Sequence, residues 1–539
     1  MKDTIKEQLA KIARDDANKP RKNVVVLGAG MAGLASAYEL SKLGHHVTII
    51  EATNRPGGRV WTKRFDATSE YHELGAMRIP ASHNYTRHYI CETGLHAKLR
   101  SFVTSHDNVN CFYYLRGQVC RIREASTKLL PHYRLSSLER KVASDEVPPA
   151  LFGIHLVNAL ASLNESDRAS LLGAPFLTDR AAQLERESLG EFLEKRVESD
   201  DARELIGCVT GLEVWWEQAV SMFLRDEITE NGIGLQELAG GMDQLPSKLA
   251  MLLPNNTIRF NVEILSIELT ENGVRLRTRP TIPPSPDGSH WDSPPSDQPV
   301  QEELADFVIC TLPFGVMRRM ELRHFSSLKM RAIRNLNYAS STKVLLHCKE
   351  RFWELGGPDE KIVGGASLSD QITRATYYPS DHAVPRTTRF ADKGTSTRER
   401  FKGFATASFP SAMESAAGFA DSPGPGVLVG SYNWGRDARR LGSLPIAERG
   451  TAVIDVLRNF HPTIDQYVDD VASMYWDGFR WCRGAFCFMR PGDLKSYYHS
   501  AIVPEGRVHF AGEHCSLEQG WIQGALISAL RAVEELVRR

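Results

Sequence analysis

The stretch that decides the fold begins with VVVLGAGMAG at residues 24–33 and continues, after a helix-like run, with VTIIE at 47–51 and RPGGR at 55–59. An apolar strand leads into a Gly-x-Gly-x-x-Gly turn, and the turn opens a helix. A second strand then ends in an acidic residue. This order of elements is typical of a dinucleotide-binding unit and is far more specific than the glycine pattern alone.

Each glycine of the turn has a separate task. Gly28 allows the tight turn, Gly30 lets the backbone approach a pyrophosphate, and Gly33 lets the helix pack closely on the strand. The first helical residues, Met31 and Ala32, present free N–H groups and the positive end of the helix dipole to the phosphates. We therefore expect these residues to bind a dinucleotide.

The second strand and the run that follows it choose between cofactors. Glu51, followed by Ala52, ends this strand about 20 residues after the turn, where a carboxylate can accept both hydroxyls of an adenosine ribose. Up to this point nicotinamide remains possible. The paired glycines and Arg59 can lay a second backbone segment and a guanidinium against the same diphosphate, which favours flavin. With this run the chain resembles the FAD-binding amine oxidase family.

Composition limits the classes of function. The chain has 539 residues, of which 42% are hydrophobic and 24% charged, and a net charge of −1, so we expect a soluble protein of two or three domains. A near-zero charge implies no nucleic-acid and no membrane partner. The nine cysteines form no CxxC pair, so no metal site is expected. The first twenty residues lack an apolar signal core, which favours a cytoplasmic protein, although a removed leader would leave no trace.

Nucleotide-fold elements recur along the chain. Strand-like runs follow at 258–267, 305–313 and 508–513, and the last of these leads into a helix at 520–538. Residues 279–303, rich in Pro, Ser and Asp, indicate a loop or disordered insertion. We therefore expect an α/β (α+β multidomain) protein with a discontinuous Rossmann-like FAD-binding domain.

The resemblance implies three domains. It places the FAD-binding domain at 21–80, 231–325 and 455–539. A mixed-sheet substrate-binding domain takes 1–20, 81–125 and 326–454. Apolar residues at helical spacing make 126–230 a helical insert, which is typical of the amino acid oxidase branch of the family.

The resemblance also places a stretch along the flavin ring. It assigns this position to Gly75, Ala76 and Met77, and it assigns the grip on the substrate carboxylate to Arg78. The chemistry agrees, because a planar guanidinium makes two parallel bonds to a carboxylate and keeps its charge. The alternative is a structural arginine in a surface ion pair. An enzyme for simple amines has no carboxylate to hold.

Two further residues are expected to be catalytic by resemblance. Lys343 lies in an alternating strand, where its side chain faces either inward or outward, and the family places a lysine here near flavin N5. A desolvated lysine has a lowered pKa and can help to move a proton. Tyr378 is expected to give its hydroxyl to the substrate carboxylate, with Tyr377 the alternative by strand parity.

The segment 476–486 resembles the family segment behind the flavin, to which Trp476 would contribute. Some amine oxidases carry a flavin-linked cysteine where this chain has Ala485, so we expect noncovalent FAD. The Gly484 carbonyl would accept from the substrate amine. Phe486 would form one wall of the pocket, with Trp521 facing it.

The remaining cofactor contacts come from two places. Gly512 and Glu513 end a strand near the ribityl and phosphate region, and the helix that begins around Gly520 and Ile522 presents its N-terminus to the flavin. Val262 would meet the adenine through its backbone, as that strand does in the family.

Together these features predict an FAD-dependent L-amino acid oxidase. It would oxidatively deaminate L-α-amino acids by hydride transfer to FAD and use dioxygen as acceptor, giving a 2-oxo acid, ammonia and hydrogen peroxide. The alternatives are an amino acid 2-monooxygenase that forms an amide, an amine or polyamine oxidase, and a flavin-binding interaction module. Glu213, Trp215, Trp216 and Glu217 could reach an entry channel, but they do not fix the side-chain preference. A homodimer or higher homo-oligomer is expected.

Overall fold

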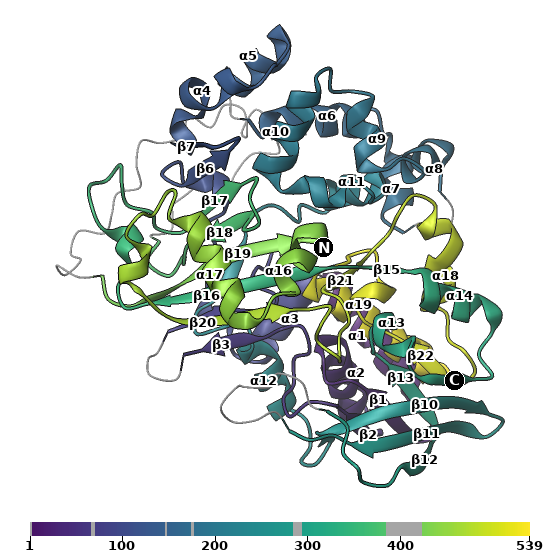
Figure 1. Cartoon of the computed structure of the whole chain (residues 1–539). Coiled ribbons are helices and arrows are strands. Elements are labelled where there is room, and N and C mark those ends of the chain that lie inside the picture. Colours follow the sequence, from purple (N-terminus) through teal and green to yellow (C-terminus); the bar gives the residue numbers. More distant parts are fainter. Residues whose placement is uncertain (1–2, 66–69, 146–147, 174–176, 284–293, 384–422) are drawn as a thin grey trace.

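Three structural regions follow one another across the protein. The computed structural model describes residues 3–65, 70–145, 148–173, 177–283, 294–383 and 423–539. In Figure 1 a helical region lies at the top, a mixed sheet in the middle, and a parallel sheet with its covering helices at the bottom. No helix in the described part of the chain is long and apolar enough to cross a membrane.

The five-stranded parallel sheet has the order β22-β13-β1-β2-β9. Its strands come from the start, the middle and the end of the chain: β1 (Asn23–Leu27), β2 (His46–Ile50), β9 (Ile258–Arg259), β13 (Phe307–Cys310) and β22 (Val508–Phe510). β1 and β13 are continuous apolar runs because both faces of a central parallel strand are covered. The dinucleotide unit is therefore completed by distant segments, as the recurring sequence elements predict.

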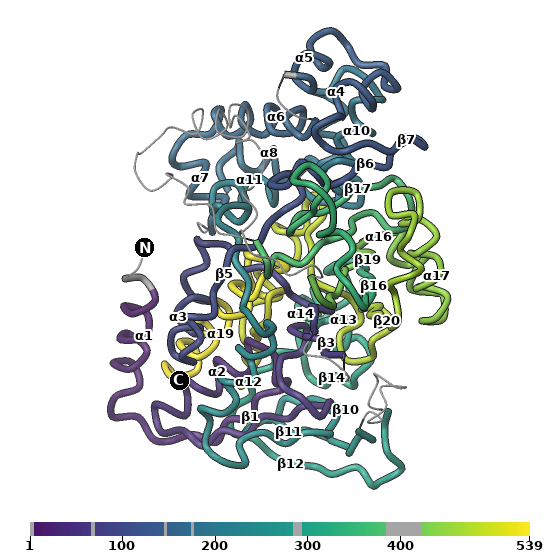
Figure 2. The backbone as a smooth tube through the Cα atoms, turned by 90° about the vertical axis from the view of Figure 1, so that its left-hand side faces the viewer, coloured from purple at the N-terminus to yellow at the C-terminus, as the bar shows by residue number. Residues whose placement is uncertain are grey.

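Helices cover this sheet. α2 (Met31–Lys42) and α19 (Ile522–Val537) share one buried cluster with β1, and α3 (Asn84–Glu92) and α12 (Gln244–Met251) contribute to it. α1 (Asp3–Asp16) lies along α19 (Figure 2), where Lys11 Nζ is 2.8 Å from Glu534 Oε1. This segment was expected in the substrate-binding domain. It packs beside the parallel sheet because the apolar face of α1, with Ile5 and Ile12, is buried in the same cluster.

A four-stranded sheet extends from the nucleotide unit in the order β12-β11-β10-β14. Its strands are β10 (Val262–Thr270), β11 (Gly273–Pro280), β12 (Gln301–Ala305) and β14 (Glu321–Arg323). The predicted insertion at 279–303 joins β11 to β12, and its residues 284–293 lie outside the described residues.

The seven-stranded mixed sheet has the order β20-β16-β19-β18-β17-β6-β7. Its members are β6 (Phe112–Leu115), β7 (Gln118–Arg121), β16 (Ser341–Cys348), β17 (Ala366–Ser369), β18 (Ala375–Tyr377), β19 (Gly426–Trp434) and β20 (Val468–Tyr475). β16 is buried along its whole length, with α16 (Gly435–Gly442) and α17 (Ile446–Leu457) packed beside it. β20 falls in the segment expected in the FAD-binding domain, but it pairs with β16 because its apolar residues complete this sheet.

The insert is helical, as its apolar spacing predicts. It contains α4 (Ala125–Lys128), α5 (Ser137–Asp145), α6 (Ala150–Ala161), α7 (Glu165–Leu171), α8 (Asp179–Glu185), α9 (Leu189–Glu194), α10 (Asp200–Thr210), the short turn η5 (Leu212–Trp215) and α11 (Val220–Ile228). Asn164 and Ser188 begin α7 and α9 with capping boxes. The insert shares a buried cluster with the seven-stranded sheet, which holds η5 and α11 over the space between the two sheets.

The remaining elements connect these regions. Among them are β3 (Thr62–Arg64), β4 (Tyr71–Glu73), β5 (Leu99–Ser101), β8 (Gln236–Leu238), α13 (Phe314–Met317), α14 (Ser327–Asn335), β15 (Asn337–Ala339), β21 (Phe486–Phe488), α18 (His499–Ile502) and η9 (Glu513–Cys515).

Candidate active site

A cavity of about 470 Å³ lies where the parallel sheet, the mixed sheet and the helical insert meet. Most of the predicted site residues line it: Gly28, Gly30, Met31, Ala32, Glu51, Arg59, Gly75, Ala76, Met77, Arg78, Lys343, Trp476, Phe486, Gly512, Glu513, Gly520, Trp521 and Ile522. Five predicted residues do not line it: Gly33, Ala52, Val262, Tyr378 and Gly484.

The glycine turn has the shape that a dinucleotide needs. Gly28 has φ +97°, a left-handed conformation that favours glycine. A Cβ on Gly33 would lie 1.9 Å from the Gly28 carbonyl oxygen, so only glycine lets α2 begin this close to β1. A Cβ on Gly30 would meet no atom within 4 Å and would project into open space. Gly57 donates its N–H to Ala29 O at 2.8 Å, so both glycine segments border one cradle that fits a diphosphate.

Glu51 lies on the cavity wall at the end of β2. Its carboxylate accepts hydrogen bonds from Ala29 N at 2.8 Å and Thr53 N at 2.9 Å, which fixes it beside the turn. Val262 does not line the cavity, but it donates its N–H to the Glu51 carbonyl at 2.9 Å. Ala52 likewise acts through its backbone, because its carbonyl accepts from the Thr281 hydroxyl at 2.7 Å. These two residues therefore position the wall in this structure.

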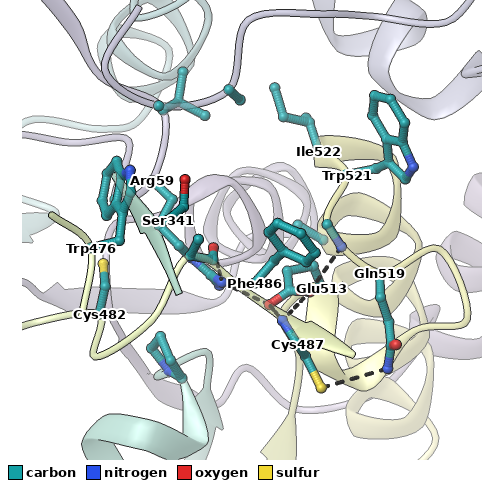
Figure 3. Close-up of a pocket in the computed structure, with 18 of the residues that line it drawn as sticks. Arg59, Ser341, Trp476, Cys482, Phe486, Cys487, Glu513, Gln519, Trp521 and Ile522 are labelled. Carbon is teal, nitrogen blue, oxygen red and sulfur yellow. Dashed lines mark hydrogen bonds and ion pairs between the residues drawn. The ribbon is translucent and has the colours of Figure 1, made fainter. Parts of the chain in front are cut away.

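Glu513 connects three separate segments at the cavity (Figure 3). Its carboxylate lies 2.7 Å from Arg59 Nη1 and accepts from Cys487 N at 3.1 Å and from Gly520 N at 3.0 Å. Arg59 also donates to the Ala485 carbonyl at 3.0 Å. The double-glycine arginine run and the C-terminal strand–helix unit, far apart in sequence, thus form one polar cluster.

Lys343 faces inward from β16. It is 1% exposed, and its Nζ donates to the carbonyls of Glu73 at 3.0 Å and Gly75 at 2.7 Å. The Met77 sulfur lies 3.3 Å away. Lys343 therefore holds the stretch that the sequence places along the flavin ring.

A buried carboxyl stands behind this lysine. Glu73 accepts from the Thr62 hydroxyl at 2.9 Å and from Met242 N at 2.8 Å. Burial raises the pKa of the Glu73 carboxyl and lowers the pKa of Lys343, while their mutual attraction opposes both shifts. Lys343 is thus a candidate proton carrier on the cavity wall, as perturbed buried groups often are.

Arg78 presents its guanidinium to the cavity between aromatic rings. Its Cζ lies 6.0 Å from the Tyr377 ring centroid and 5.9 Å from that of Phe102. Burial raises the pKa of the Tyr432 hydroxyl, and the positive charge of Arg78 nearby opposes that rise. Arg59, by contrast, is in an ion pair with Glu513. In the described part of the chain no carboxylate pairs with Arg78, so its charge is available to a ligand.

The structure does not bring Tyr378 to the site. Tyr378 is 2% exposed, and its hydroxyl lies 2.8 Å from Ser367 Oγ and 2.7 Å from His461 Nε2. β18 ends at Tyr377, and adjacent residues of a strand point to opposite faces. Tyr377, the alternative by strand parity, is the one that lines the cavity.

The aromatic wall of the cavity differs from the expected facing pair of Phe486 and Trp521. Trp476 lines the cavity and donates its indole N–H to the Leu74 carbonyl at 3.2 Å. Trp521 packs edge-on against His83, with ring centroids 5.1 Å apart. Phe486 instead pairs with Trp215 at 5.2 Å. No ring contact between Phe486 and Trp521 occurs in the regions that the structure describes.

The Gly484–Cys487 segment concerns two expectations, the Gly484 carbonyl as an acceptor for the substrate amine and the noncovalent binding of FAD. Gly484 has φ +138° and lies against Tyr338, outside the cavity lining. Ala485 lines the cavity and offers no thiol. The Cys487 thiol receives a hydrogen bond from Gln519 Nε2 at 3.6 Å, and burial raises its pKa well above the usual range, so it stays protonated. Cys482 also lines the cavity, so noncovalent FAD stays a prediction that rests on Ala485.

The helical insert supplies residues that sequence reasoning left unplaced. Trp215 lines the cavity, as do Leu212, Met222 and Phe223 of the same insert. Glu213 pairs with Arg374, and Glu217 lies 2.7 Å from Arg490, so neither carboxylate is free. In the sequence, only the adjacent tryptophans Trp215 and Trp216 indicate that this part of the insert could contact a substrate. The sequence does not show which of the two rings faces the cavity.

The described residues contain no group of His, Cys, Asp and Glu side chains that could hold a metal ion. A glycine turn and a second glycine run that border one cavity, with a buried lysine on its wall, fit a flavin-dependent oxidoreductase. The chain belongs to the flavin-containing amine oxidoreductase family, whose model matches residues 31–537.

Known proteins support this assignment. The flavin-dependent L-tryptophan oxidase RebO of Lentzea aerocolonigenes is 31% identical over 96% of this chain and 98% of its own length. The L-amino-acid oxidase of Vipera ammodytes ammodytes is 27% identical over 100% of this chain and 97% of its own length. Putrescine oxidase bound to putrescine has a TM-score of 0.68 at 17% identity, covering 96% of this chain and 100% of that chain, which shows the shared fold. Cyclohexylamine oxidase from Brevibacterium oxydans has a TM-score of 0.67 at 18% identity, covering 96% of this chain and 99% of that chain.

Proposed function

We propose that the protein is an L-amino acid oxidase. The observation that carries this proposal is Arg78, a guanidinium that borders the cavity and has no carboxylate partner in the described residues. Such a group at the reacting end of a cavity favours a substrate with a carboxylate, because two parallel charge-assisted hydrogen bonds fix both affinity and orientation. A simple amine gives it nothing to hold.

In this proposal different residues bind the substrate carboxylate, carry the proton and hold the cofactor. Arg78 binds the carboxylate, and Tyr377 and Tyr432 line the cavity with it, the Tyr377 ring centroid 6.0 Å from its Cζ. Lys343 Nζ, buried and bonded to two carbonyls, holds or releases a proton at the reacting end. The glycine cradle, Glu51 and Arg59 would hold FAD, which would supply a two-electron acceptor that dioxygen could reoxidise with release of hydrogen peroxide. The imine product hydrolyses to a 2-oxo acid and ammonia.

The experiment is a peroxide assay with all twenty L-amino acids and several amines, with an absorption spectrum to confirm flavin. Peroxide, ammonia and 2-oxo acid from L-amino acids support the proposal. Amide and carbon dioxide would identify an amino acid 2-monooxygenase instead. Turnover of amines alone would identify an amine oxidase. No turnover with any compound would favour a flavin-binding module.

We also propose the three-part division of the chain with two changes. α1 joins the FAD-binding part, because it packs on α19, and β20 joins the substrate-binding sheet, because it pairs with β16. Assembly into a homodimer or higher homo-oligomer belongs to the same proposal, and sedimentation velocity tests it.

A further inference from the structure

An aromatic cluster borders the cavity beyond Arg78. Trp215 of η5 lies 5.2 Å from Phe486 of β21 and 6.1 Å from Trp434 of β19, measured between ring centroids. These three rings come from three distant parts of the chain, yet all line the same cavity. Each is only half-buried, so each keeps ring surface for a ligand.

Tyr432 connects this cluster to the carboxylate grip. It lines the cavity together with Arg78, and its ring centroid lies 4.2 Å from that of Trp434. Tyr432 and Trp434 are two residues apart on β19, so their side chains leave the same face of the strand. A substrate whose carboxylate is held at Arg78 therefore has aromatic surface within reach of its side chain.

The charges behind this wall compensate one another. Arg374 pairs with Glu213 and lies 2.7 Å from Asp437, and none of the three lines the cavity. A charged substrate side chain thus meets no free counter-ion at the aromatic wall. A cation–π contact is weaker than the desolvation that an ammonium group suffers on burial. Aromatic and large apolar side chains, in contrast, gain from ring packing.

One carboxylate on the cavity wall would instead favour a substrate with a basic side chain. Asp226 of α11 lines the cavity and accepts a hydrogen bond from Asn231 Nδ2 at 2.8 Å. It lies on α11 with Met222 and Phe223, which also line the cavity. A lysine or arginine side chain that reached Asp226 would find a counter-charge there.

We propose that Trp215, Trp434 and Phe486 form the side-chain subsite of the substrate, and that it selects L-amino acids with aromatic or large apolar side chains. This inference rests on the proposed function, since it takes the carboxylate to be held at Arg78. The helical insert, through Trp215, is then part of the specificity site and not only a cover.

The test measures kcat/KM of the holoenzyme for L-phenylalanine, L-tryptophan, L-leucine, L-alanine, L-lysine and L-glutamate. We expect L-phenylalanine or L-tryptophan to exceed L-lysine and L-glutamate by about 100-fold or more. Trp434→Leu should lower the ratio of L-phenylalanine to L-alanine by about tenfold. The matched control is Trp216→Phe, because Trp216 packs against Gly190 and Gly207 and does not line the cavity, so the ratio should stay unchanged.

Binding gives a readout that does not need turnover. Titration with 3-phenylpropanoate and with propanoate, followed by flavin absorbance, should show tighter binding of the aryl acid, and Trp434→Leu should remove that difference. Equal or better turnover of L-lysine would overturn the subsite and point to Asp226, as would an unchanged ratio in Trp434→Leu. If no L-amino acid is oxidised at all, the proposed function fails, while the two acids still decide whether the subsite exists.

Discussion

Replacing Tyr378 with phenylalanine is expected to weaken the fold and leave turnover nearly intact. The hydroxyl lies between Ser367 Oγ at 2.8 Å and His461 Nε2 at 2.7 Å. Burial lowers the pKa of His461 to about 3, so its ring is neutral at working pH. Removing the hydroxyl leaves buried polar atoms without their partner, which costs about 1–3 kcal/mol of unfolding free energy.

Urea unfolding and peroxide release, measured on the same holoenzyme preparation, check this prediction. The unfolding free energy of Tyr378→Phe should fall by about 1–3 kcal/mol, with kcat/KM for the best L-amino acid within about threefold of wild type. The matched variant Tyr377→Phe should do the reverse, with near-normal stability and kcat/KM lowered by about tenfold through one lost hydrogen bond. If Tyr378→Phe abolished turnover at unchanged stability, the placement of the two tyrosines would be refuted.

Three further predictions concern the glycine turn, the Glu513 cluster and the buried lysine. Gly33→Ala places a Cβ 1.9 Å from the Gly28 oxygen, so bound flavin after gel filtration should drop sharply, whereas Gly232→Ala, where a Cβ meets no atom within 4 Å, should retain it. Glu513→Gln removes the charge of a buried carboxylate that accepts hydrogen bonds from Arg59, Cys487 N and Gly520 N. The unfolding free energy should fall by about 2–3 kcal/mol, and flavin should be lost. Burial lowers the pKa of Lys343 below 10.5, so at this site the unfolded chain binds one proton more than the folded chain up to pH 10.5. Glu73, whose raised pKa gives the folded chain an extra proton, has the opposite effect at lower pH, so wild-type stability is expected to rise with pH between the Glu73 pKa and pH 10.5. Lys343→Met should flatten this rise, and an unchanged slope in urea titrations would contradict the burial of a neutral amine.

The cofactor half of the site was readable from the sequence because its signals are local. The spacing of Gly28, Gly30 and Gly33 reports a turn whose shape depends on neighbouring residues only, and the structure has that turn. Arg59 and Glu513 are far apart in sequence, but each belongs to a local motif, and the structure joins them in an ion pair.

The substrate half depends on tertiary packing that no local pattern reports. The sequence allowed either Tyr377 or Tyr378 to face the substrate, and the answer depended on where β18 ends. Trp215 sits in a short turn with no periodicity, and its place at the cavity comes from packing of the insert on the mixed sheet. The pairing of β20 with β16 is likewise a long-range choice that an alternating strand pattern leaves open.

The proposed function requires Arg78 to bind the carboxylate of an L-amino acid. Its most direct test is kcat/KM for the best L-amino acid and for the amine that lacks its carboxylate, measured in wild type and in Arg78→Ala. We expect Arg78→Ala to lower kcat/KM for the amino acid by about 10²–10⁴-fold, the loss expected for two charge-assisted hydrogen bonds, and to remove the preference over the amine. An unchanged kcat/KM for the amino acid, or a wild-type preference for the amine, would contradict it.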